Sequence, residues 1–223
     1  MQCEKIVADW NCPVIVVASG PSLDPNIAWT CRKKRWFDGW RIVAINDAYK
    51  FFINADILYG CDAKWWEVHG GASDFRGERW SSHSEQKDAA NDKREAADRF
   101  GLRCVYGYHR AGFSRDPACI HYGSNSGFQA CNIAIHKGAT RLVLVGFDMN
   151  VKGGRNHFFG DHPKPLSHNT NYNGFIQAFR QACPPPVPII NATPDSALDC
   201  FPRVTLAKAL QDQEGDFRAN PAA

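Results

Sequence analysis

The stretch PVIVVASGPSLD, residues 13–24, decides the fold of this chain. Its first half is an apolar, β-branched run, and its second half consists of small residues with a proline at the turn. Gly20 lets the backbone approach another group closely, Pro21 sets φ at about −65°, and Ser22 or Asp24 can cap a following helix. We therefore predict a buried strand, followed by a loop of small residues whose backbone lies close to a bulky group.

Similar short apolar runs recur along the chain. They are rich in β-branched residues and apolar on both faces, which is typical of parallel strands covered by helices on each side. We expect strands at residues 14–19, 41–46, 56–62, 102–107, 141–148 and 187–191.

Helical patterns lie between these runs. Residues 92–100 form a polar, alanine-containing pattern, and residues 126–139 and 171–183 carry apolar residues at helical spacing. This alternation predicts an α/β fold: a single Rossmann-like domain with a doubly wound, mostly parallel sheet over residues 1–212. We expect residues 213–223 to form a disordered tail.

One polar segment interrupts the pattern. Residues 70–92 are rich in glycine and serine, and we expect them to form a surface excursion. Trp65, Trp66 and Trp80 lie in or near this segment. Their side chains either line a cleft for a flat ligand or fill the edge of the hydrophobic core, and we favour the second interpretation.

Composition excludes several classes of protein. The 223 residues carry a net charge of +3 and are 44% hydrophobic, as in ordinary globular proteins. The apolar runs are too short to span a membrane, the N-terminus lacks the apolar core of a secretory signal, and nine scattered cysteines suit reduced thiols. We expect a cytoplasmic protein. The basic cluster at residues 31–36 is interpreted as a solvated helix face, and nucleic-acid binding is not expected.

Small or polar side chains follow most of the predicted strands. In open α/β sheets, ligands bind beyond the carboxyl ends of the strands, so these side chains converge on one region. Their convergence predicts a nucleotide site. The candidate nucleotide-binding residues are Ser19, Gly20, Pro21, Ser22, Asn46, Asp47, Asp62, Ser124, Asn125, Ser126, Asp148 and Asn150.

These candidates suit different parts of a nucleotide. The loop Ser19–Ser22 suits a cradle of backbone N–H groups and hydroxyls around a phosphate or ribose, although it is neither a Walker A nor a GxGxxG sequence. Residues 124–126 either contribute to the same site or only cap a helix. Asn46 and Asp47 either bind a base or ribose or form an Asx turn.

The segment 150–169 holds three histidines and an aspartate among glycines and prolines, which is unusual for a plain connector. Histidine supplies a base near neutral pH. The spacing of His157 and His162 is not that of a helical metal pair, so we favour a general base or a phosphate contact over zinc. The candidate catalytic residues are His168, His162 and His157.

Five segments occur in an order that resembles two related families: VIVVASGPSLD, AINDAY, YGSNSGFQACNIAIHKGATRLVLVGFDM, SHNTNYNGFIQAF and IINATPDSAL. One is the family of bacterial sialyltransferases that use CMP-sialic acid. The other is the family of archaeal 6-hydroxymethylpterin pyrophosphokinases, whose many relatives include phage-encoded members. The resemblance covers most of the chain and implies a nucleotide-dependent transferase.

The resemblance also implies roles for individual residues. The loop Ser19–Ser22, Asn46 and Ser126 would hold the nucleotide part of a donor, and His168, just before a helix, would be the general base. The sialyltransferases place a pair of tyrosines after the fifth strand to hold the donor phosphate. Residues 149–159 of this chain contain no tyrosine.

Three functions are therefore considered. We favour a glycosyltransferase with a nucleotide-sugar donor and a histidine base. The second is a pyrophosphokinase that uses ATP with Mg²⁺ held by Asp62, Asp148 or Asp161. The third is a protein that binds a nucleotide without chemistry. The partners are a small-molecule donor and, for the enzymes, an acceptor that the sequence does not identify; a homo-oligomer stays open.

Overall fold

The computed structural model of the chain describes residues 3–83, 93–163, 166 and 170–211. Its centre is an eight-stranded sheet in the order β6-β5-β4-β3-β2-β1-β7-β8, and every neighbouring pair is parallel. The strands are β1 (Cys12–Val17), β2 (Arg41–Ile45), β3 (Ile57–Tyr59), β4 (Glu78–His83), β5 (Arg103–Tyr108), β6 (Cys119–His121), β7 (Ala139–Val145) and β8 (Ile189–Asn191).

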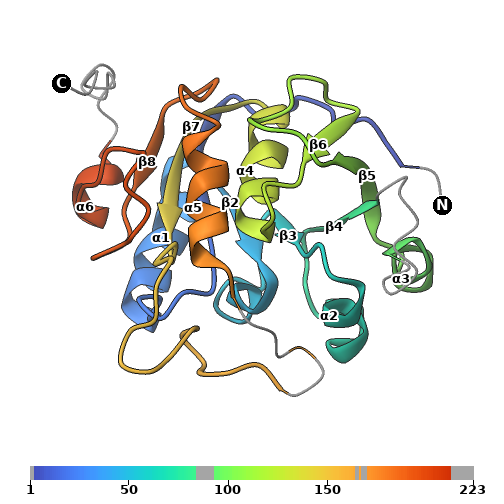
Figure 1. Ribbon diagram of the computed structural model, residues 1–223, viewed down its shortest axis with the longest axis horizontal. Helices are drawn as coiled ribbons and strands as arrows, with labels where there is room; N and C mark the ends of the chain where they lie inside the picture. Colours follow the sequence, from blue (N-terminus) through green and yellow to red (C-terminus); the bar gives the residue numbers. More distant parts are fainter. Residues whose placement is uncertain (1–2, 84–92, 164–165, 167–169, 212–223) are drawn as a thin grey trace.

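Helices cover both faces of this sheet (Figure 1). One face carries α1 (Pro25–Asp38), η1 (Asn46–Phe51), α2 (Ala63–Val68), η2 (Gly70–Ala72), α3 (Lys93–Phe100) and α6 (Leu206–Ala209), and the other carries α4 (Ser126–His136) and α5 (Tyr172–Arg180). Side chains of β1 alternate between the two cores: Ile15 and Val17 pack on the first face, and Val14 and Val16 on the second. This is the Rossmann-like, doubly wound α/β fold predicted from the sequence.

The strand order reverses beside β1. The chain winds outward from β1 through β6 and then returns to add β7 and β8 on the other side of β1. The loops that follow β1 and β7 consequently lie against each other, and the Gly20 amide donates to the Gly146 carbonyl over 3.0 Å. Ligands of doubly wound sheets bind at the carboxyl ends of the strands beside such a reversal.

The quoted opening stretch folds as predicted. Val14–Val17 are fully buried, and β1 pairs on one side with β2 and on the other with β7. After the loop, Asp24 caps α1 by accepting from the Asn26 and Ile27 amides over 2.7 and 2.8 Å. A buried strand, a tight loop and a capped helix therefore follow one another within this stretch.

The surface excursion predicted at residues 70–92 is wrong in its middle. Residues Glu78–His83 form β4, an internal strand of the sheet, and Trp80 is fully buried. Trp65 and Trp66 on α2 are also buried, as favoured from the sequence. The polar residues of β4 misled the prediction because their partners come from distant parts of the chain.

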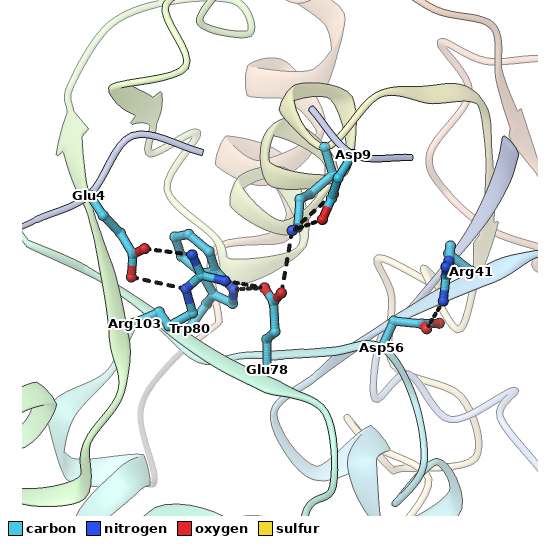
Figure 2. A network of polar contacts seen from close by, with 8 residues as sticks. Glu4, Asp9, Arg41, Asp56, Glu78, Trp80 and Arg103 are labelled. Carbon is cyan, nitrogen blue, oxygen red and sulfur yellow. Dashed lines mark hydrogen bonds and ion pairs between the residues drawn. The ribbon is translucent and has the colours of Figure 1, made fainter. Parts of the chain in front are cut away.

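The amino-terminal edge of the sheet is held by charged side chains. Arg103 at the start of β5 lies between Glu4 and Glu78, with its guanidinium 4.5 Å from the ring centroid of Trp80 (Figure 2). Lys137, just after α4, is 3% exposed and lies 3.4 Å from the Glu78 carboxylate. Ion pairs thus connect residues at the amino-terminal ends of the strands, whereas the loops that follow β1 and β7 lie at the carboxyl ends.

Within the described ranges, no helix has both the length and the apolar character needed to cross a membrane. The tail expected at residues 213–223 lies outside the described residues.

Candidate functional site

A pocket of about 250 Å³ lies at the carboxyl edge of the sheet, at the reversal between β1 and β7. It is formed by the loops after β1, β2, β3 and β7, by the start of α4 and by the start of α5. Most of the residues predicted from the sequence line it: Ser19, Gly20, Asn46, Asp62, Ser124, Asn125, Ser126, Asp148, Asn150, His157 and His162.

The loop after β1 is bound mainly to the end of β7 and to Asp148, beside the pocket. The amides of Ala18 and Gly20 donate to carbonyls at the end of β7, and the Ser22 amide lies 3.3 Å from the Asp148 carboxylate. A Cβ at Gly20 would lie 2.1 Å from that carboxylate, so the close approach requires glycine. With these amides engaged, the predicted N–H cradle is wrong for Gly20 and Ser22, and Pro21 and Ser22 do not line the pocket.

Ser19 joins the ends of β1 and β2. Its hydroxyl donates to the Ile45 carbonyl over 3.2 Å and accepts from the Ala48 amide over 3.1 Å. It thereby fixes the backbone of Asn46, which has a positive φ of 47°. A non-glycine residue in this conformation is uncommon and typical of functional sites.

Asp148 is a buried anchor at the end of β7. Its side chain accepts from the Ser22 hydroxyl over 2.8 Å and lies 3.0 Å from Lys152 Nζ. Asp161, its predicted partner in a magnesium site, is exposed and does not line the pocket. Among the described residues, no group of three or more His, Cys, Asp or Glu side chains could hold a metal ion. Asp148 and Asp161 therefore do not fit a shared Mg²⁺ site.

The start of α4 lines the pocket. Asn125 caps the helix by accepting from the Phe128 amide over 2.8 Å, and Ser126 and Gly127 line the pocket one residue further on. The first amides of a helix have no intrahelical partner and attract anions. A Cβ at Gly127 would lie 2.7 Å from the ring of Phe147, so glycine is needed where the helix meets the loop after β7.

Three side-chain oxygens of residues that line the pocket are buried without a hydrogen-bond partner among the described residues: Asn46 Oδ1, Asp148 Oδ1 and Asn150 Oδ1. Of these, Asp148 Oδ1 forms the ion pair with Lys152. Buried acceptors are normally paired, so these atoms are exceptions of the kind that a binding site can explain. The pocket is thus lined by the start of α4 and by polar side chains at the ends of β2 and β7.

The histidines after β7 form a ring cluster at the mouth of the pocket. His157 stacks on Phe159 with centroids 5.0 Å apart and lies 4.4 Å from the ring of His162. Both histidines line the pocket, within reach of a bound ligand. His168, the third predicted catalytic residue, lies outside the described residues.

The structure adds residues that the sequence analysis missed. Asn156, Thr170, Tyr172 and Phe175 also line the pocket. The Tyr172 hydroxyl donates to Asn156 Oδ1 over 3.1 Å, and burial raises the pKa of Tyr172. This tyrosine stands at the start of α5, beyond the segment searched for a phosphate-binding tyrosine. The signal that could have located it is the helix start at Asn171, which caps α5 by accepting from the Gly174 amide.

Asp47 does not line the pocket, although its neighbour Asn46 does. Its carboxylate is 2% exposed and accepts from Trp65 Nε1 over 2.8 Å and Lys50 Nζ over 2.6 Å, with His69 Nε2 3.0 Å away. The predicted contact between Asp47 and a nucleotide is therefore wrong, because these partners already occupy the carboxylate.

Sheet and pocket together define a doubly wound α/β protein of the Rossmann-like class, with its ligand pocket at the reversal of strand order. One solved structure with this fold is the sialyltransferase CstII from Campylobacter jejuni, in complex with a substrate analogue, cytidine-5′-monophosphate. It superimposes with a TM-score of 0.55 at 16% sequence identity, over 100% of this chain and 93% of that chain. No protein-family model matches this chain, and no curated protein matches it significantly.

Proposed function

We propose that the protein is a glycosyltransferase that binds a nucleotide-sugar donor in the pocket between β1 and β7. The observation that carries this proposal is the juxtaposition, in one pocket, of the start of a helix, polar side chains at two strand ends and two histidines. The likeness of the fold to a sialyltransferase solved with CMP supports the same class.

The start of α4 suits the phosphate of a nucleotide, and the polar side chains at the strand ends suit its ribose or base. The phosphate would bind at the start of α4, where the amides of Ser126 and Gly127 and the helix dipole favour an anion. The ribose or base would donate to Asn46 Oδ1 and Asn150 Oδ1. Tyr172 would lie at the phosphate side, as a substitute for the tyrosines that the resemblance implies after the fifth strand.

The chemistry requires one base. A histidine takes the proton of the acceptor hydroxyl, the hydroxyl oxygen forms a bond to the anomeric carbon, and the bond from that carbon to the phosphate oxygen breaks. The electron pair leaves on the nucleotide, where the amides of α4 stabilise it. His162, His157 and His168 are the candidate bases, the first two from their place in the pocket wall.

The first test is isothermal titration of the full chain with CMP, UMP and AMP. We expect a pyrimidine nucleotide to bind without added metal. Binding of none of the three would contradict the proposal, and binding of AMP only in the presence of Mg²⁺ would favour a pyrophosphokinase instead.

The second test identifies the base by release of CMP from CMP-N-acetylneuraminic acid. We expect one of His157→Ala, His162→Ala and His168→Ala to lower kcat by about 10²- to 10⁴-fold with little change in CMP affinity. His83→Ala, outside the pocket, is the matched control. Equal kcat in all four variants would exclude a histidine base.

A further inference from the structure

A second, smaller cleft of about 230 Å³ adjoins the nucleotide pocket. It lies between the loop after β5, the turn before α4 and one side of α5. Ser124 lines both the cleft and the pocket, so the two spaces meet at this residue. A group bound in the cleft therefore lies beside a donor bound at the start of α4.

The wall between the two spaces is a rigid turn. Ser124 has a positive φ of 59°, uncommon for a serine, and the preceding Gly123 has a φ of 51°. A Cβ at Gly123 would lie 2.2 Å from the ring of Phe128, so the turn is pressed against α4. Strained backbone of this kind is typical of ligand-binding sites.

The cleft carries positive charge. His109 and Arg110 are exposed and line it, together with Gln177 on α5 and Gln181, the residue that follows this helix. Arg110 packs over the ring of Tyr108 at 5.5 Å and forms no ion pair with a described residue. Neither Asp nor Glu is found among the described residues that line the cleft. A planar guanidinium of this kind suits a carboxylate or a phosphate.

The size of the cleft limits what it can hold. At about 230 Å³, close to the 250 Å³ of the nucleotide pocket, the cleft has room for a sugar ring with its substituents. With its charged group at Arg110, such a sugar would turn a hydroxyl toward Ser124 and the anomeric carbon of the donor.

We infer that this cleft is the acceptor site and that the acceptor is an anionic sugar, carrying a carboxylate or a phosphate. The inference rests on the proposed function, since it assigns the second substrate of the same transfer. The acceptor hydroxyl forms the new bond to the anomeric carbon, its proton passes to the histidine base, and the nucleotide departs.

Binding is tested by saturation-transfer NMR on the full chain saturated with CMP, using glucuronic acid, glucose 6-phosphate and glucose. We expect both anionic sugars to bind at least tenfold more tightly than glucose, and the better of the two to identify the charged group. Arg110→Gln removes this preference, Arg110→Lys keeps part of it, and Arg115→Gln, outside the cleft, leaves it unchanged.

The outcomes separate the two proposals. If glucose binds as tightly as the anionic sugars, or if Arg110→Gln keeps the preference, the anionic acceptor site is wrong. If CMP binds and none of the sugars does, the inference fails and the proposed function stands. If the anionic sugars bind at Arg110 but no nucleotide binds, the proposed function fails and the cleft remains an anion site.

Discussion

At the scale of single residues, Asp47 is an aspartate at a strand end whose hydrogen bonds stabilise the fold. His69 Nδ1 faces the Trp65 carbonyl over 2.9 Å and its Nε2 faces Asp47 over 3.0 Å, so both ring nitrogens have acceptors as partners. The ring also stacks on Trp65, with centroids 4.2 Å apart. This cluster holds η1 and therefore the backbone of Asn46 in the pocket wall.

The cluster makes stability depend on pH. Burial alone would raise the pKa of Asp47, but hydrogen bonds from His69, Lys50 and Trp65 outweigh it and hold that pKa well below its usual range. A carboxylate of lowered pKa contributes stability above its unfolded-state pKa of about 3.9, and this contribution is lost as the pH falls through the folded-state pKa.

We therefore predict that Asp47→Asn lowers the free energy of unfolding by about 2–3 kcal/mol at pH 7, since the partners lose a buried anion. Urea unfolding at pH 7, 5, 4 and 3 should show the gap between variant and native protein closing below about pH 4. Asp24→Asn is the control, because asparagine caps a helix as well as aspartate does. A gap of equal size at every pH would contradict this account of Asp47.

At the scale of elements, the start of α4 matters more for the site than the loop after β1. Both loops are rich in small residues, but the amides after β1 donate to the end of β7, whereas the first residues of α4, Ser126 and Gly127, line the pocket. Asn125 stands at this point, with its Oδ1 on the Phe128 amide and its Nδ2 on the Gly123 carbonyl over 2.8 Å.

The substitution Asn125→Asp tests α4 as the phosphate site. Aspartate keeps the helix cap but places a negative charge beside the proposed phosphate, and two like charges at about 5 Å repel by a few kcal/mol near a protein surface. We predict at least a tenfold loss of CMP affinity by titration calorimetry. Cytidine, which lacks the phosphate, should lose much less, and this comparison cancels the loss of the Gly123 bond. An equal loss for both ligands would place the phosphate elsewhere.

At the scale of the whole molecule, the two edges of the sheet are built differently. Ion pairs close the amino-terminal edge around Glu78, which contacts Arg103 at 3.0 Å, Lys137 at 3.4 Å and Trp80 Nε1 at 2.6 Å. Among the described residues, the carboxyl ends of the strands instead carry the pocket, whose wall includes buried oxygens without a hydrogen-bond partner. The ion pairs around Glu78 and the pocket thus lie at opposite ends of the strands.

This separation predicts that Glu78→Gln destabilises the protein without changing the site. The neutral amide would leave Arg103 and the buried Lys137 with weaker partners, and hydrogen bonds to charged groups are worth about 1.5–3 kcal/mol. We expect a loss of about that size in denaturant unfolding and an unchanged Kd for CMP. Lys137→Met should cost less, because its partners Asp9 and Glu78 are 53% and 34% exposed and can be solvated. A change in CMP affinity would show that the two edges are coupled.

Whether a strand can be predicted from the sequence depends on its length and on the polarity of its residues. Apolar runs such as residues 14–19 and 141–148 were recognised, because a strand covered on both faces needs apolar side chains at every position. β4 was missed because its polar residues pair with distant ones, and β6 because its sequence, CIH, is not an apolar run rich in β-branched residues. Most residues of the candidate site could also be predicted from the sequence, because they directly follow a predicted strand.

The sequence by itself thus determined the α/β class and the set of loops that could meet a ligand. Only the tertiary structure decided how those loops are used: Ser22 and Asp47 are bound within the scaffold, the start of α4 lines the pocket, and Tyr172 joins the pocket from α5. The physical reason is that strand and helix formation follows patterns of neighbouring residues, whereas the hydrogen-bond partners of a polar side chain come from segments far apart in the chain.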